Sequence, residues 1–238
     1  MKKYIDKVTV TGASDDTSLE DMVKIQKEYP YVEWGILLSR KQAGRSWRFP
    51  SFTWINRLIT SPLETELTLS GHLCGSLVND LLLGNLTDDL CNIFISGFER
   101  IQINTHGIRH KYDLDKFHRI IGENRAVQWI FQNDEVNSEL ITKTKEAGIW
   151  NISALYDLSH GAGVLPDKWD DPLDGIYTGY AGGLSVDNLE SQLEKLDEVV
   201  GDKTVWIDAE THLRSNGDVN FDLDKVVKFL QIAKSRVV

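Results

Sequence analysis

The chain has few cysteines, few prolines and no long apolar run, and each shortage excludes a class of protein. Two of its 238 residues are cysteines, Cys74 and Cys91; they provide no disulfide framework, and their spacing fits no zinc motif. The five prolines are scattered, and no linker rich in Pro, Gly or Ser divides the chain. No apolar run approaches the length of a membrane span, and the first residues lack the apolar core of a signal peptide. We therefore expect a cytoplasmic protein that forms a single domain over residues 1–238.

Positive charge is also scarce, which bears on the partners of the protein. The chain has 26 Lys and Arg against 36 Asp and Glu, a formal net charge of −10. Nucleic-acid binding needs a basic face, and this sequence has none, so we expect no nucleic-acid partner and no membrane partner. A small anionic ligand remains compatible with the composition, because a local group of backbone amides and arginines binds an anion against a negative background. We expect no cofactor.

What the sequence does contain is a repeated pair of a short strand and an amphipathic helix. The predicted strands cover 7–11, 31–38, 67–74, 98–105, 126–131, 150–157, 176–181 and 204–209. The predicted helices cover 18–28, 51–60, 76–84, 113–122, 135–147, 186–199 and 222–235, and the helix between the sixth and seventh strands is short or missing. Ser18, Ser51 and Ser185 are placed as helix caps. Eight alternating units predict an α/β fold, a (β/α)₈ barrel with a parallel eight-stranded sheet.

Polar residues alternate with apolar ones along the predicted strands. Thr9 and Thr11 on the first strand, and Ser70 and His72 on the third, illustrate the pattern. Because successive side chains on a strand point to opposite faces, one face packs on the helices and the polar face points into the barrel. Two interpretations stay open: a hydrogen-bonded polar core layer, or a ligand cavity near the carboxyl ends of the strands.

Two strand ends carry the strongest signal for a site. The sixth strand ends at Asp157 and leads into a loop that contains Gly161 and Gly163. The seventh ends in Gly182 and Gly183 and continues through Ser185 towards a helix. In a (β/α)₈ barrel the strand carboxyl ends form the active face, and glycine-containing loops near the last strands often bind an anion. The alternative for Asp157 is a carboxylate that caps a neighbouring loop.

These motifs resemble those of the phosphoribosylanthranilate isomerases, (β/α)₈ enzymes of tryptophan biosynthesis, and of their divergent relatives. The segment from Gly182 to Asn188 (Gly-Gly-Leu-Ser-Val-Asp-Asn) is similar to their Gly-Gly-Leu-Asn-Pro-Glu-Asn, and Asp157 lies at the end of the sixth strand as their acid does. The resemblance implies an Amadori rearrangement with Asp157 as the general acid. The family has a cysteine as the base at the end of the first strand, where this chain has Thr11. A threonine hydroxyl is no base near neutral pH without an activating partner.

The resemblance also implies a phosphate site after the eighth strand, where this chain differs. Glu210 and His212 stand where the family has small residues, and a carboxylate there repels phosphate unless it points elsewhere or a cation intervenes. Gly182 and Gly183 remain suitable for an anion, and Arg214 is a source of positive charge. Phosphate binding and its loss both remain open.

Other residues are candidates to replace the missing base. Cys74 and His72 share a face of the third strand, and a thiol near an imidazole becomes a nucleophilic thiolate; the alternative is an inert buried cysteine. His106 follows the fourth strand in a His-Gly pair that also occurs in the family, and the alternative is a histidine bonded to backbone. Arg45 and Arg48 flank Trp47 in a loop that either closes over an anionic ligand or is simply exposed.

Three functional hypotheses follow. The first is an isomerase or lyase acting on a small sugar-phosphate or phosphoribosyl-type ligand, with the family base replaced. The second is a catalytically inactive protein that sequesters or senses such a metabolite. The third is a metal-dependent hydrolase that uses Asp208, Glu210 and the histidines, although no compact ligand motif is present and we expect no metal site.

Overall fold

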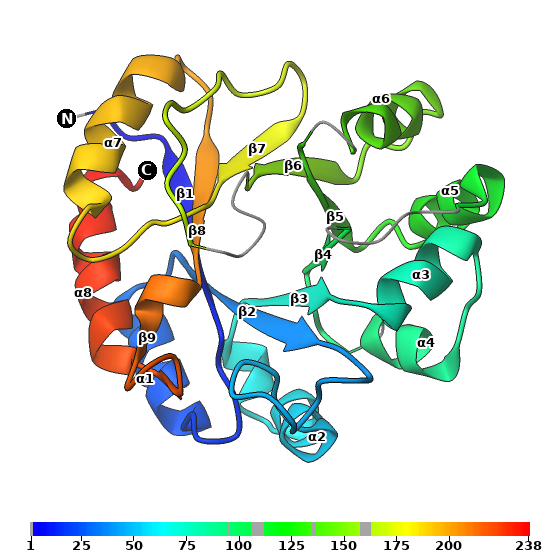
Figure 1. Cartoon of the computed structure of the whole chain (residues 1–238), viewed down its shortest axis with the longest axis horizontal. Helices are drawn as coiled ribbons and strands as arrows, with labels where there is room; N and C mark the ends of the chain where they lie inside the picture. Colours follow the sequence, from blue (N-terminus) through cyan, green and yellow to red (C-terminus); the bar gives the residue numbers. More distant parts are fainter. Residues whose placement is uncertain (1, 95, 106–111, 135–136, 158–162) are drawn as a thin grey trace.

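Eight parallel strands close into a barrel with helices around its outside (Figure 1). The computed structural model describes residues 2–94, 96–105, 112–134, 137–157 and 163–238. The strands follow one another around the barrel in chain order: β1 (Ile5–Thr11), β2 (Val32–Leu38), β3 (Leu69–Leu73), β4 (Arg100–Ile103), β5 (Gln128–Gln132), β6 (Ile152–Tyr156), β7 (Tyr177–Tyr180) and β8 (Val205–Ala209). The predicted parallel (β/α)₈ barrel is confirmed.

The helices lie between the strands in sequence and pack on the outer face of the barrel. They are α1 (Leu19–Glu28), α2 (Phe52–Thr60), α3 (Ser76–Leu83), α4 (Asp88–Phe94), α5 (Leu114–Glu123), α6 (Ser138–Glu146), α7 (Leu189–Val199) and α8 (Leu223–Ala233). Helix α4 is not predicted from the sequence, and neither is the antiparallel pair β9 (Arg214–Ser215) and β10 (Asn220–Phe221). Between β6 and β7, the described residues 163–176 form no helix.

Two of the three predicted helix caps are confirmed. The Ser18 hydroxyl accepts a hydrogen bond from the Asp21 amide, and the Ser51 hydroxyl accepts one from the Trp54 amide. The prediction for Ser185 is wrong, because α7 begins at Leu189 and Asn188 is its N-cap. The segment from β7 to α7 is therefore a longer loop than the sequence predicts.

The polar face of the strands does point into the barrel. Thr9 pairs in register with Glu33, and the Thr9 hydroxyl donates to the Glu33 carboxylate at 2.7 Å. Glycines make room for large interior groups: a Cβ atom on Gly179 would lie 2.1 Å from the Trp206 indole, and one on Gly35 would lie 2.1 Å from the Thr11 hydroxyl. The interior is thus a tightly packed layer of mixed polarity. The space for a ligand lies beyond this layer, at the carboxyl ends of the strands.

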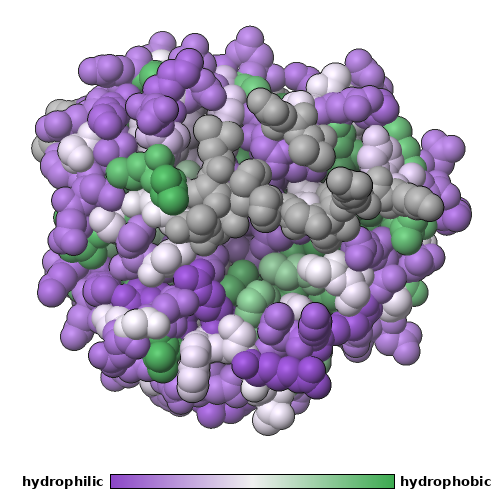
Figure 2. Space-filling model, viewed as in Figure 1, coloured by the Kyte–Doolittle hydropathy of each residue, from purple (hydrophilic) through white to green (hydrophobic). Residues whose placement is uncertain are grey.

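The outer surface is mainly hydrophilic. In the view of Figure 2, apolar residues form only small, separate patches between hydrophilic ones. In the described part of the chain, no helix is both long and apolar enough to cross a membrane.

Candidate functional site

A small cavity of about 40 Å³ opens at the carboxyl ends of the strands. Several of the predicted site residues line it: His72, Asp157, Gly163, Gly182, Gly183, Asp208 and Glu210. They come from β3, from the segments after β6 and β7, and from β8 with the loop that follows. Because all of these strands are parallel, their carboxyl ends meet at one face, and residues up to 140 positions apart in sequence share one cavity (His72 to His212).

Asp208 is the most buried of the three carboxyl groups that line the cavity. It lies on β8 with 6% of its surface exposed, and the Thr11 hydroxyl donates a hydrogen bond to its Oδ1 atom at 3.0 Å. Burial raises the pKa of Asp208 well above its usual value, and the negative charges of Glu210, Glu33 and Asp157 act in the same direction. Thr11 therefore holds a carboxyl group that favours its protonated form.

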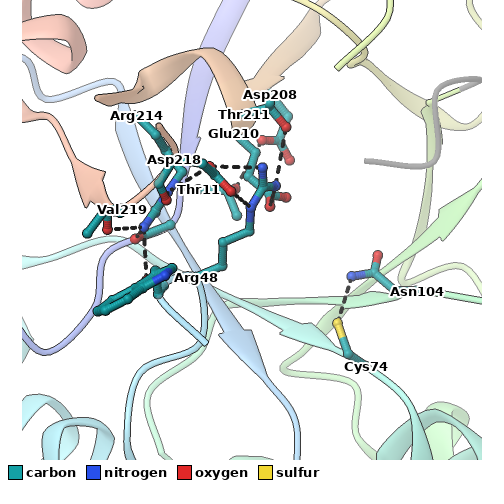
Figure 3. A network of polar contacts seen from close by, with 12 residues as sticks. Thr11, Arg48, Cys74, Asn104, Asp208, Glu210, Thr211, Arg214, Asp218 and Val219 are labelled. Carbon is teal, nitrogen blue, oxygen red and sulfur yellow. Dashed lines mark hydrogen bonds and ion pairs between the residues drawn. The ribbon is translucent and has the colours of Figure 1, made fainter. Parts of the chain in front are cut away.

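Glu210 is held by an arginine from the loop between β2 and α2. Arg48 Nη1 donates to Glu210 Oε1 at 2.7 Å, and its other nitrogens donate to the two carboxylate oxygens of Asp218 at 2.8 and 2.9 Å (Figure 3). Burial raises the pKa of Glu210, and the Arg48 guanidinium opposes that rise. A cation that offsets the charge of Glu210 near an anion site is thus present in Arg48. It already pairs with two carboxylates, those of Glu210 and Asp218.

Asp157 follows the last residue of β6 and lies at the cavity wall, 9% exposed. Its charge contributes to the raised pKa of both Asp208 and Glu210. The three carboxyl groups therefore interact electrostatically, which is the arrangement that separates the pKa values of neighbouring acids.

His72 and Cys74 do not form the reactive pair that the sequence suggests. The Cys74 thiol donates to the backbone carbonyl of His72 at 3.6 Å and accepts a hydrogen bond from the Asn104 amide at 3.2 Å. Burial raises the pKa of Cys74 to about 11 and lowers the pKa of His72 to about 3, with the Arg100 charge adding to the effect on His72. Near neutral pH the thiol is protonated and the imidazole is uncharged, so the proposed thiolate does not form. In Figure 3, Cys74 and Asn104 stand apart from the group around Arg48.

The glycine loop after β7 lines the cavity with Gly182, Gly183 and Leu184. Gly182 and Gly183 have positive φ angles of 106° and 68°, and a Cβ atom on Gly183 would lie 2.5 Å from the backbone nitrogen of Leu165. The N–H groups of Gly182, Gly183 and Leu184 donate to no acceptor among the described residues. Consecutive amides of this kind suit an anion.

Arg214 does not line the cavity, which corrects the sequence prediction. Its guanidinium donates to four backbone carbonyls, those of Gly12, Trp47, Asp218 and Val219, at 2.9 to 3.0 Å. The side chain is fully buried and also pairs with the Asp218 carboxylate at 3.1 Å. Arg214 therefore fastens the end of β1 and the loop after β2 to the β9–β10 turn, and its charge acts on the cavity only at a distance, by lowering the pKa of Glu210.

The other predicted residues divide into those away from the cavity and those outside the described residues. Arg45 is exposed and lines a separate surface pocket with Asp15, Asp16 and Trp47. Ser185 does not line the cavity, and its amide donates to the Asn188 side chain at 2.9 Å. His106 and Gly161 lie outside the described residues.

The described residues contain no group of three or more His, Cys, Asp or Glu side chains placed to hold a metal ion. One charged residue that sequence reasoning missed is Arg100, which pairs with Glu33 inside the barrel at 3.0 Å. An arginine at the start of a strand is ordinarily exposed. The burial of Arg100 follows only from its inward-facing position in the alternation of the strand.

Comparison with solved structures finds the same barrel fold in other proteins. The phosphoribosylanthranilate isomerase of Thermotoga maritima is 17% identical with a TM-score of 0.58, and the match covers 96% of this chain and 98% of that chain. N-(5'-phosphoribosyl)anthranilate isomerase from Pyrococcus furiosus is 12% identical with a TM-score of 0.56, over 98% and 99%. The 3-hexulose-6-phosphate synthase from Salmonella typhimurium is 12% identical with a TM-score of 0.52, over 97% and 99%.

No protein-family model matches the chain, and no curated protein matches its sequence. Sequence identities this low show a shared fold and nothing finer. The resemblance to phosphoribosylanthranilate isomerases that the sequence motifs indicate is therefore confirmed for the architecture of the barrel.

Proposed function

We propose that this chain is an isomerase or lyase that moves protons on a small sugar-phosphate or phosphoribosyl-type ligand. One observation carries the proposal: carboxyl groups from the ends of β6 and β8 line the same cavity as a glycine loop whose amides donate to no acceptor among the described residues. The carboxyl groups are suited to acid–base chemistry, and the loop is suited to an anion. The fold neighbours, which act on phosphoribosyl and hexulose-phosphate compounds by name, are compatible with this assignment.

The phosphate of the ligand would lie against the amides of Gly182, Gly183 and Leu184. Glu210 lines the same cavity, and without a partner its charge would oppose a phosphate. The ion pair with Arg48 at 2.7 Å reduces this opposition. The sugar end of the ligand would then lie towards Asp157 and Asp208.

Proton transfer then falls to the carboxyl groups. His72 and Cys74 are poor bases or nucleophiles because their pKa values are shifted to about 3 and about 11. Asp157 and Asp208 differ in burial and hydrogen bonding, which is how two carboxyl groups acquire different roles in one site. We assign Asp157 to proton transfer on the substrate, as the sequence motif predicts.

The test is a search for turnover in D₂O with a panel of aldose and ketose phosphates and phosphoribosyl compounds, monitored by NMR for deuterium at carbon and for product. Asp157→Asn is expected to reduce turnover by about 100- to 10,000-fold, the range of a general acid or base. Asp174→Asn is the control, because that carboxylate is fully exposed and pairs only with Lys203. Unchanged turnover in Asp157→Asn would refute the assignment.

A binding protein is the second candidate. It is favoured by the state of the groups that replace the family base: Thr11 donates a hydrogen bond, and Cys74 is a protonated thiol. In that case the panel would give tight binding, seen as a rise in melting temperature, with every ligand recovered unchanged and without deuterium. Product formation would remove this candidate.

A further inference from the structure

The environment of Asp208 is more specific than that of the other carboxyl groups in the cavity. Its Oδ1 atom accepts the hydrogen bond from Thr11, whereas its Oδ2 atom has no hydrogen-bond partner among the described residues. The residue is 6% exposed, and it lines the cavity. One oxygen is therefore fixed, and the other is available to a ligand.

A second feature is the negative charge held beside Asp208. Glu210 lies two residues further along the chain, and its carboxylate pairs with Arg48 at 2.7 Å. Arg48 is itself anchored by two hydrogen bonds to Asp218, so the guanidinium is fixed between two acids. Burial raises the pKa of Glu210, and the Arg48 guanidinium opposes that rise. The negative charge of Glu210 in turn makes it harder for Asp208 to ionise.

We propose that Asp208 is kept as a neutral carboxylic acid by its burial and by the neighbouring Glu210 carboxylate, and that it is the proton donor of the cavity, with Asp157 as the acceptor. The donor step rests on the proposed function. The protonated state of Asp208 does not, because it follows from burial and neighbouring charge alone. The sequence motif gives Asp157 the role of general acid, whereas this assignment gives that role to Asp208 and makes Asp157 the base.

The two carboxyl groups complete an isomerisation without any further reagent. The Asp157 carboxylate takes the proton from C2 of an open-chain aldose, and the C–H electron pair forms the C1–C2 double bond. The carbonyl π electrons move to O1, which takes the proton from Asp208. In the second half the Asp208 carboxylate takes the O2 proton, the carbonyl forms at C2, and Asp157 returns its proton to C1. Both residues end as they began.

Three acids and one hydroxyl group act on the pKa of Asp208. Glu210 follows it on the same strand segment, Glu33 lies on β2, and Asp157 follows β6; all three raise the pKa of Asp208. Thr11 on β1 acts in the opposite direction, because its hydroxyl stabilises the ionised form. The burial of Asp208 is the largest single contribution. Removing one of the three acids is therefore expected to lower the pKa of Asp208, and removing the Thr11 hydroxyl is expected to raise it.

The first experiment measures the titration of Asp208 in the ligand-free full chain, by NMR of protein labelled with ¹³C at the aspartate carboxyl carbon. The signal missing from Asp208→Asn identifies the residue. We expect that signal to be that of the acid at pH 7. Glu210→Gln is expected to lower the midpoint by about one pH unit or more, and Thr11→Val to raise it. Asp218→Asn is the matched control, because it removes the other partner of Arg48 and leaves Glu210 in place.

A midpoint near pH 4 for Asp208 in the wild-type chain would overturn the inference, and so would a midpoint that Glu210→Gln leaves unchanged. The second experiment uses an aldose phosphate that the wild type turns over. Asp208→Asn is expected to abolish turnover, and Glu210→Gln to move the alkaline limb of the pH–rate profile to lower pH. Full turnover by Asp208→Asn would refute the donor role. Failure of the wild type to turn over any compound would instead count against the proposed function, and the titration would still decide the state of Asp208.

Discussion

Replacing Arg100 by methionine tests how the polar interior of the barrel is stabilised. Arg100 lies on β4 with 2% of its surface exposed, and its Nη1 atom is 3.0 Å from Glu33 Oε1, which is fully buried. The guanidinium carbon also lies 4.0 Å from the centre of the Trp206 ring and 5.4 Å from that of Tyr177. The variant Arg100→Met keeps most of the side-chain volume, so it removes the charge and its contacts while limiting the loss of packing.

The expected cost is a large fraction of the stability of the protein. Removing one partner of a buried ion pair costs about 3–5 kcal/mol, because the other charge is left without compensation. The lost cation–π contact with Trp206 contributes about 2 kcal/mol when it is desolvated. The two effects overlap, so we expect Arg100→Met to lower the free energy of unfolding by about 4–6 kcal/mol. Domains of this kind have about 5–15 kcal/mol in total.

The pair itself is imperfectly satisfied, which predicts a rescue. Glu33 Oε2 and the Nε and Nη2 atoms of Arg100 have no hydrogen-bond partner within the described chain. Replacing both charges with apolar groups removes these unpaired atoms together. We therefore expect the double variant Arg100→Met with Glu33→Leu to be more stable than Arg100→Met alone.

The assay is urea unfolding followed by circular dichroism and tryptophan fluorescence, with free energies obtained by linear extrapolation. Arg100→Lys is the matched control, because it keeps the positive charge but not the planar group that stacks on Trp206. Agreement between the two spectroscopic probes establishes a single transition. A loss below about 1 kcal/mol for Arg100→Met would refute the reasoning, since it would mean that Glu33 is not buried against this cation.

Three further predictions use other parts of the barrel. Arg214→Met removes four hydrogen bonds to backbone carbonyls and is expected to cost about 3 kcal/mol, with Arg214→Lys intermediate, in the same urea assay. Gly179→Ala places a methyl group 2.1 Å from the Trp206 indole and is expected to cost about 3 kcal/mol or to prevent folding, whereas Gly122→Ala, whose Cβ would meet no atom closer than 3.7 Å, is expected to fold normally. The folded-state pKa of Asp208 is raised, so the wild type binds a proton there on folding. Relative to Asp208→Asn, its free energy of unfolding is expected to fall by up to about 1.4 kcal/mol per pH unit as pH rises from about 4 towards that raised pKa. A pH-independent difference between the two would contradict this.

The barrel could be predicted from the sequence because its signals are local. Alternation along each strand and caps such as Ser18 and Ser51 depend on residues within one turn or one strand, and the structure keeps them. The prediction for Ser185 failed because Asn188, three residues later, binds both the Ser185 amide and the Gly183 carbonyl and moves the helix start. The path of the loop decides whether Ser185 or Asn188 caps the helix, and the sequence pattern does not predict that path.

The sequence indicated the carboxyl, glycine and arginine members of the candidate site but not the partners of the arginines. Asp157 and Asp208 follow from strand parity, since a residue at the end of an inward-facing series lines the barrel mouth. Arg48 lies in a loop and Arg214 begins β9, and they have partners 162 and 202 positions away in sequence, at Glu210 and Gly12. Long flexible side chains reach different partners from the same backbone position. The sequence therefore did not indicate that Arg48 pairs with two acids, whereas Arg214 donates to backbone carbonyls and pairs with Asp218.

Thr11 and Asp208 are best understood together, and the relation between them follows from the closure of the barrel. β1 and β8 are neighbours, and Thr9 stands opposite Asp208 in their register. Thr11, two residues further along β1, therefore reaches Asp208 with its hydroxyl at 3.0 Å. A threonine cannot replace a cysteine as a base, but it can orient a carboxyl group on the adjacent strand while leaving the second oxygen to the cavity. In the proposed function, the proton-transferring group is accordingly on β8 and not on β1.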